Sequence, residues 1–148
     1  MNIIFICTGN TCRSPMAEAI AAKKFGEAGI SAAFSSAGVA VSKSSPASGH
    51  AAAAAYDNGL NISRHMSRPV TEQRLKKADI VLTMTHNHKM CLTESYPDLE
   101  HKIYTIYEYA DGSENGVADP FGGGRQEYDA CFAELCGLID RLIIKFRN

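Results

Sequence analysis

The sequence lacks any apolar run long enough to cross a bilayer, since its longest stretches lie at the N-terminus and around residues 142–144 and are short. It also lacks a basic N-terminal segment followed by a cleavage site, so no signal peptide is expected. No block of like charges occurs, and the net charge is −1. These absences argue against nucleic acid or an anionic membrane as the main partner, and they favour the cytoplasm.

The cysteines also lack the pattern of a disulfide-rich protein. Their number is odd, no C-x-x-C motif is present, and they are spread along the chain as Cys7, Cys12, Cys91, Cys131 and Cys136. This usage excludes a disulfide framework and suits a reducing compartment. Cys131 and Cys136 fall in an amphipathic helical stretch, where we interpret them as buried small apolar residues.

Strand and helix patterns alternate along the 148 residues, without repeats or linkers. We expect one domain, 1–148, with strands at 3–7, 30–36, 80–84 and 103–109. Helices are expected to begin at Ser14-Pro15 and Ser45-Pro46 and to stop at Gly29 and Asn58-Gly59, with further helices at 71–77, 86–95 and 125–146. The sequence therefore predicts an α/β fold with a four-stranded doubly wound parallel sheet and helices on both faces.

Residues 111–124 are rich in glycine, serine, asparagine and proline and are predicted to form a loop. The balanced charge, together with the lack of an obvious exposed apolar face, predicts a monomer.

Cys7 and Arg13 stand at the two ends of a short loop between the first strand and the first helix. Backbone N–H groups and a helix N-terminus at such a loop favour a phosphate-like anion, and the same positive field favours the nucleophilic thiolate. Gly9 and Asn10 tolerate the left-handed backbone that an anion-binding nest requires. The loop thus predicts a cysteine-dependent phosphoryl-transfer site. The alternative is a buried cysteine and a surface arginine on an ordinary turn.

The segment from residue 7 to residue 18 reads Cys7-Thr8-Gly9-Asn10-Thr11-Cys12-Arg13-Ser14-Pro15-Met16-Ala17-Glu18. It closely resembles the phosphate-binding loop of the low-molecular-weight protein tyrosine phosphatases. The resemblance extends along nearly the whole chain, through Ser35-Ser36-Ala37-Gly38, His65 ahead of Arg68-Pro69-Val70-Thr71, and Asp119-Pro120.

The resemblance implies a role for each matching residue. Cys7 attacks phosphorus and forms a phosphocysteine, Arg13 binds two phosphoryl oxygens, and Asp119 protonates the leaving group and then activates water. The loop from Thr8 to Arg13 binds the phosphate through its N–H groups, which belong to Thr8, Gly9, Asn10, Thr11, Cys12 and Arg13.

Supporting roles are expected for Ser14, whose hydroxyl would donate to the Cys7 sulfur, and for Ser36 and His65, which would brace the loop through Asn10. A reversible disulfide between Cys7 and Cys12 would protect the nucleophile, whereas the alternative makes Cys12 a small apolar loop residue.

No metal or cofactor is expected. The pair formed by His86 and His88 has no evident carboxylate or cysteine partner with which to bind a metal. The expected chemistry needs no metal.

Residues at the rim of the loop bear on the substrate. Tyrosine-directed members usually carry a bulky aliphatic residue at the position of Thr11 and aromatic residues on both cleft walls. Here residues 39–45 contain no aromatic and only Phe121 remains. Thr11, the run Asp-Pro-Phe-Gly-Gly and Met84-Thr85-His86 resemble the protein arginine phosphatase branch. A threonine hydroxyl can meet the N–H groups of a phosphoguanidinium, so we favour protein phosphoarginine as substrate, with phosphotyrosine second.

Two other classes remain as alternatives. Thiol-dependent arsenate reductases share this fold, but they use two further cysteines near the end of the third strand, where only Cys91 occurs. A non-catalytic module that binds phosphate would not need both Cys7 and Asp119. Phosphorylated proteins are therefore the expected partners.

Overall fold

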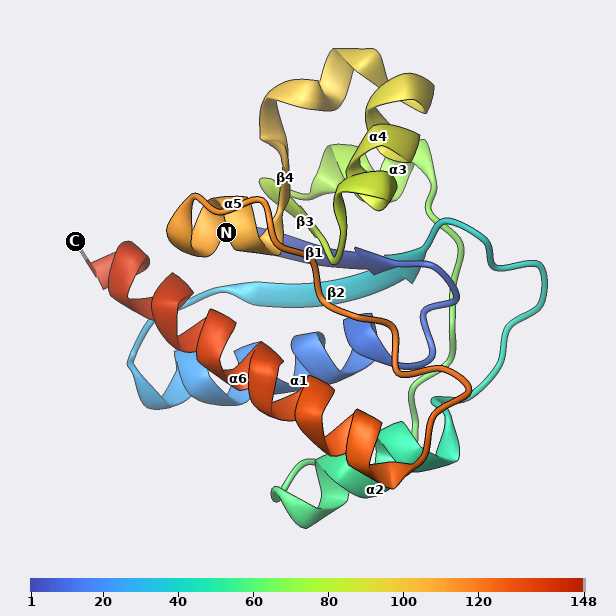
Figure 1. The fold of residues 1–148 in the computed structure, drawn as a ribbon. Coiled ribbons are helices and arrows are strands. Elements are labelled where there is room, and N and C mark those ends of the chain that lie inside the picture. The colour runs from blue at the N-terminus through green and yellow to red at the C-terminus, as the bar shows by residue number, and fades with distance from the viewer. Residues whose placement is uncertain (148) are drawn as a thin grey trace.

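The computed structural model describes residues 1–147. Its centre is a parallel sheet in the order β2–β1–β3–β4 (Figure 1). The strands are β1 (Asn2–Cys7), β2 (Ala33–Gly38), β3 (Ile80–Thr83) and β4 (Ile103–Thr105). The predicted four-stranded parallel sheet is confirmed, and the loop between β1 and the first helix lies where it was expected.

Helices cover both faces of the sheet (Figure 1). One face carries α1 (Arg13–Glu27), α2 (Gly49–Asp57) and α6 (Arg125–Arg147), and the other carries α3 (Glu72–Lys77) and α4 (His86–Ser95). The short η1 (Pro97–Lys102) follows α4, and α5 (Ile106–Asp111) packs against α6. Within residues 1–147 no helix is long and apolar enough to cross a membrane.

The continuous apolar run of β1 arises because this strand is buried on both faces. Ile3 and Phe5 join the core beneath α1 and α6, whereas Ile4 and Ile6 join the core beneath α3 and α4. Cys131 belongs to the first core, where burial raises the pKa of its thiol to about 12, and Cys136 is half-buried against it. The apolar interpretation of Cys131 is thus confirmed.

The predicted helix starts at Ser14 and Ser45 were wrong. Helix α1 begins at Arg13, and the Ser14 hydroxyl contacts Cys7 and Asn10 rather than a backbone N–H. Helix α2 is capped by Ser48, whose side chain accepts a hydrogen bond from Ala51. The predicted stops were close, since α1 ends at Glu27 and α2 ends at Asp57.

Two strand predictions also need correction. The second strand, expected at 30–36, is β2 at Ala33–Gly38. The fourth, expected at 103–109, ends at Thr105 because α5 starts there. The Thr105 hydroxyl accepts a hydrogen bond from the N–H of Glu108, and the Glu108 carboxylate accepts one from the N–H of Thr105. This reciprocal capping box satisfies two otherwise unpaired donors and favours a helix over a longer strand.

Candidate active site

A pocket of about 220 Å³ opens at the C-terminal end of β1, where the chain turns into α1. Parallel α/β sheets commonly bind ligands at this edge. The pocket is lined by the loop and by two residues from the segment before α6: Cys7, Thr8, Gly9, Asn10, Thr11, Cys12, Arg13, Asp119 and Phe121. The structure therefore brings together the predicted catalytic residues, the predicted phosphate-binding residues and both predicted selectivity residues.

The Cys7 sulfur lies at the base of this pocket, with only 3% of the residue exposed. Its Sγ is 2.8 Å from the Oγ of Ser14. Ser14 Oγ also accepts a hydrogen bond from the Nδ2 of Asn10, at 2.7 Å. Because the amide of Asn10 supplies a donor, the hydroxyl proton of Ser14 is left to point at the sulfur. In this arrangement the Ser14 hydroxyl can donate to the Cys7 sulfur.

Asn10 is fully buried, and its φ of 55° is the left-handed conformation that asparagine tolerates. Its Nδ2 also donates to Ser36 Oγ at 3.0 Å, and its Oδ1 accepts from the backbone N–H of Arg68 at 3.0 Å. Its carbonyl oxygen lies 2.7 Å from the Nε2 of His65. The expected supports Ser14, Ser36 and His65 thus all meet at Asn10, which fixes the curvature of the loop.

The loop is also held from β2, at a place where the backbones approach closely. The N–H of Val39 donates to the carbonyl of Cys7, and the N–H of Ala40 donates to that of Thr8, each at 3.0 Å. A Cβ at Gly38 would lie 2.5 Å from the Thr8 oxygen. Any larger residue at Gly38 would therefore push the loop out of place.

Arg13 is 4% exposed, and its guanidinium bridges the loop and the segment before α6. Nη1 donates to the carbonyl of Val117 at 2.9 Å. Nη2 lies 3.5 Å from Thr8 Oγ1 and 3.5 Å from the Oδ2 of Asp119. These contacts hold the planar donor fork at the pocket and bring the Asp119 carboxylate to its mouth.

Asp119 is about half exposed, and its other oxygen, Oδ1, accepts a hydrogen bond from the N–H of Phe121 at 3.1 Å. The turn this bond closes leaves Phe121 largely exposed, at 78%. A carboxyl group at the opening, an arginine inside and a thiol at the base follow the order in which a leaving group, a phosphoryl group and a nucleophile would sit.

Cys12 lines the same pocket, but its sulfur contacts neighbouring elements. It lies 3.4 Å from Ser48 Oγ on the α2 side and 3.5 Å from the hydroxyl of Tyr128 on α6. Burial raises the pKa of Tyr128, and the hydrogen bond to Cys12 raises it further. Cys7 and Cys12 are both free thiols.

His88 is a part of the site that our reasoning from the sequence missed. Its Nε2 lies 2.8 Å from Thr8 Oγ1, and its Nδ1 lies 3.0 Å from Thr85 Oγ1. Burial, together with the cation of Arg13, lowers the pKa of His88 from 6.5 to about 4. His88 is therefore neutral at physiological pH and positions the Thr8 side chain next to Arg13. Its place after β3, at the ligand-binding edge of the sheet, was the available signal.

A model of the family described as low molecular weight phosphotyrosine protein phosphatase matches residues 2–147. The protein-arginine-phosphatase of Bacillus subtilis (strain 168) is 41% identical over 142 residues, which cover 96% of this chain and 94% of the relative. The low molecular weight protein-tyrosine-phosphatase PtpB of Staphylococcus aureus is 38% identical over 143 residues, covering 96% of each chain.

A solved structure gives the same result for the fold. The crystal structure of a YwlE mutant from Bacillus subtilis superposes with a TM-score of 0.97 at 38% identity, covering 100% of this chain and 99% of the other.

Proposed function

The chain belongs to the low molecular weight phosphotyrosine protein phosphatase family, and on that premise we propose that it removes phosphoryl groups from arginine side chains of proteins. The reaction proceeds through a phosphocysteine on Cys7. The choice of substrate is based on the composition of the pocket rim. Thr11 offers a hydroxyl there, and Phe121 is the only aromatic among the lining residues.

In the first step the Cys7 thiolate attacks phosphorus, and an S–P bond forms as the P–N bond breaks. The electron pair of the P–N bond goes to the guanidine nitrogen, which takes a proton from the Asp119 carboxyl group. Arg13 and the loop N–H groups bind the phosphoryl oxygens on which negative charge is spread. The position of Asp119 at the mouth, 3.5 Å from Arg13, supports this role.

In the second step the Asp119 carboxylate takes a proton from water, whose oxygen attacks phosphorus as the S–P bond breaks. The electron pair returns to sulfur, and the Ser14 hydroxyl, 2.8 Å away, donates to the departing thiolate. Inorganic phosphate leaves, and Asp119 is protonated again for the next turnover. Ser36 and His65 act as positioning residues through Asn10.

Several features favour phosphoarginine over phosphotyrosine. The segment from residue 39 to residue 45 contains no aromatic side chain that could stack on a phenyl ring. The Thr11 hydroxyl can accept a hydrogen bond from a guanidinium N–H, whereas a phenyl ester has none to offer. The relative from Bacillus subtilis is named a protein-arginine-phosphatase.

The test compares kcat/KM on matched phosphoarginine and phosphotyrosine peptides, with Cys7→Ser as the blank. The parent should prefer phosphoarginine, and Thr11→Ile should shift the ratio toward phosphotyrosine by roughly tenfold or more, because a lost polar contact discriminates strongly. Thr11→Val keeps the shape without the hydroxyl and should reproduce the loss on phosphoarginine. A parent that prefers phosphotyrosine, with a neutral Thr11→Ile, contradicts the proposal.

A second candidate is phosphotyrosine itself, because the relative from Staphylococcus aureus is named a protein-tyrosine-phosphatase and Phe121 offers one exposed ring. Arsenate reduction is disfavoured, since Cys7 and Cys12 are the only cysteines among the lining residues and Cys91 is exposed on α4.

We also propose that the protein acts as a monomeric single domain, 1–148, in the cytoplasm.

We further propose that Cys12 protects Cys7 by a reversible disulfide under oxidation. Peroxide should inactivate the parent reversibly, with activity restored by a dithiol, and should inactivate Cys12→Ser largely irreversibly. Recovery of activity measures the difference. Equal recovery in both proteins would assign Cys12 to packing against Ser48 and Tyr128 alone.

A further inference from the structure

Asp119 lies on a segment that the rest of the fold contacts at few points. Between Val117 and α6 every residue is exposed except Pro120. The segment ends in three glycines, 122–124, and Gly122 has a φ of 84°, in the left-handed region that favours glycine. Such a run would adopt many conformations by itself, so contacts at its two ends must hold Asp119 at the mouth of the pocket.

The N-terminal end of the segment is fixed by the sheet and by the site itself. Val117 is fully buried, and its N–H donates to the carbonyl of Met84 at 2.9 Å. Its own carbonyl accepts the hydrogen bond from Nη1 of Arg13 at 2.9 Å. This end therefore moves only if the core or the catalytic arginine moves.

The C-terminal end is held by Glu127, the third residue of α6. Its Oε2 accepts a hydrogen bond from the N–H of Gly124 at 2.8 Å. A Cβ at Gly123 would lie 2.8 Å from the Cγ of Glu127, so the backbone packs directly on the glutamate side chain. The N–H of Gly123 in turn donates to the carbonyl of Pro120 at 2.9 Å. The contacts of Glu127 thus extend to the residue that follows Asp119.

The Glu127 carboxylate has no other bond in the part of the chain that the structure describes. It forms no ion pair there, and Gly124 is its hydrogen-bond partner. A glutamate at this helical position usually completes a reciprocal capping box with a serine or threonine hydroxyl, which a glycine cannot provide. The interaction of Glu127 is therefore with the segment that carries the catalytic carboxyl group.

Arg125 fixes the start of α6 relative to the loop of residues 7–13. Its Nη2 donates to the Asp57 carboxylate and to the carbonyl of Ala53, both on α2. At the other end of α2, the N–H of Ser48 donates to the carbonyl of Thr11 at 2.9 Å. The first turn of α6 is thus a fixed support for the glycine segment.

We propose that Glu127 is a positioning residue for proton transfer by Asp119. By holding Gly124 it keeps the Asp119 carboxyl group at the mouth of the pocket, 3.5 Å from Arg13. The inference rests on the proposed function, in which Asp119 protonates the leaving group. Without this bond the carboxyl group spends less time within reach of the leaving atom, whereas Cys7 and the loop are unchanged. The loss therefore falls on substrates whose leaving group needs a proton.

The test measures kcat/KM on two aryl phosphates. Phenyl phosphate has a basic phenolate that needs a proton to leave, whereas the phenolate of p-nitrophenyl phosphate leaves readily without one. Glu127→Ala should lower kcat/KM roughly tenfold on the first and less than about twofold on the second. Partial unfolding would lower both values equally and leave their ratio unchanged. Glu127→Gln keeps an oxygen acceptor for Gly124 and should restore most of the ratio.

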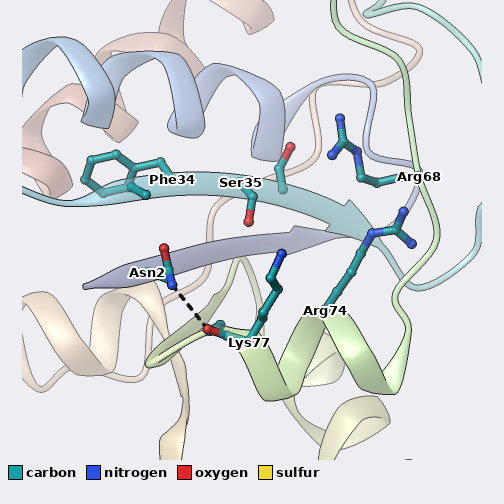
Figure 2. Close-up of a pocket in the computed structure, with 9 residues that line it drawn as sticks. Asn2, Phe34, Ser35, Arg68, Arg74 and Lys77 are labelled. Carbon is teal, nitrogen blue, oxygen red and sulfur yellow. Dashed lines mark hydrogen bonds between the residues drawn. The ribbon is translucent and has the colours of Figure 1, made fainter.

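A matched pair of arginine variants tests the support. Arg125→Gln should change the ratio in the same direction but less, because the start of α6 loses its bonds to α2. Arg74→Gln is the control, since Arg74 also donates to a backbone carbonyl, that of Pro69. It rises from α3 beside a cavity of about 270 Å³ at β2 (Figure 2), on the face of the sheet opposite α6. The Arg74→Gln ratio should equal that of the parent.

Asp119→Asn separates failure of this inference from failure of the proposed function. It removes the proton itself, so it should show the largest loss on phenyl phosphate relative to the nitro compound. If Asp119→Asn leaves the ratio unchanged, the proposed role of Asp119 is wrong. If that variant changes the ratio but Glu127→Ala does not, Glu127 only caps α6 and the positioning role is contradicted. A change as large in Arg74→Gln as in Glu127→Ala would contradict it too.

Discussion

Asn10 meets two requirements of the loop at once: it adopts the left-handed backbone, and its side chain donates hydrogen bonds. Neither glycine nor aspartate would meet both. Glycine would adopt the left-handed backbone but would supply no donors to Ser14 and Ser36. Aspartate has no N–H donor and would place a negative charge near the Cys7 thiolate. The choice of asparagine therefore follows from the hydrogen bonds around it and not from the turn alone.

His88 gives the first prediction at this scale. Replacing it with glutamine removes a buried ring that bonds Thr8 and Thr85. Because the variant loses about one hydrogen bond that positions Thr8, its kcat/KM should be roughly fivefold lower. His86→Gln is the control, because His86 is exposed on the same helix. Steady-state kinetics that show the same effect for both variants would contradict a positioning role for His88.

The pH dependence of stability tests whether His88 is buried in its neutral form. Its pKa is about 4 in the folded protein and 6.5 in a model compound, so the unfolded chain binds the proton first as pH falls. The parent should therefore lose about 2 kcal/mol of unfolding free energy between roughly pH 7.5 and pH 5 through this residue. His88→Gln should lack this component in urea denaturation at each pH. If the free energies of unfolding of the two proteins changed equally with pH, this contribution from His88 would be contradicted.

The residues at the site could largely be predicted because their neighbours in sequence are also their neighbours in space. Cys7, Gly9, Asn10 and Arg13 form one loop, so a short motif was enough. His88 comes from a different element, and its bond to Thr8 joins residues that are far apart in the chain. No spacing rule links such residues, and only the sheet order brings them together.

At the scale of elements, the prediction concerns the start of α5. Thr105→Ala removes the acceptor for the N–H of Glu108 and half of the capping box. The variant should lose about 1 kcal/mol of unfolding free energy in urea, and the amides of α5 should exchange faster. Thr105→Ser keeps the hydroxyl and is the matched control. Equal destabilisation by alanine and serine would show that the lost methyl group is responsible.

Element boundaries were harder to predict than the elements themselves. Ile103 to Tyr109 is rich in the β-branched and aromatic residues that favour a strand. The capping box at Thr105 nevertheless starts a helix after three strand residues. The Ser-Pro pair at Ser14 suggested a helix cap, yet its hydroxyl is drawn to Cys7 and Asn10 by tertiary contacts. Local signals compete with longer-range bonds, and in the folded chain the longer-range bonds prevail here.

For the whole molecule, the site and the fold share their stabilising contacts. The loop of residues 7–13 is tied to the end of β2, to α6 through Cys12 and Tyr128, and to the segment before α6 through Arg13. A ligand that binds this loop must therefore stabilise the entire domain. Inorganic phosphate at about ten times its Kd should add about 1.4 kcal/mol to stability.

This linkage is measured as a shift in Tm, with chloride at matched ionic strength as the reference. The parent should gain roughly 4 to 5 °C, given the size of the domain. Arg13→Gln should gain little, since it loses the buried guanidinium at the pocket. A shift of equal size in both proteins would place the phosphate elsewhere on the surface.

The hydrogen-bonded loop of residues 7–13 has a further consequence. In the proposed reaction its N–H groups and Arg13 bind the phosphoryl group, which substrate and product have in common, while Thr11 and Phe121 at the rim face the part in which they differ. Free phosphate therefore competes with every substrate for the same place. Turnover in a living cell would then depend on the surrounding phosphate concentration as well as on the abundance of modified protein.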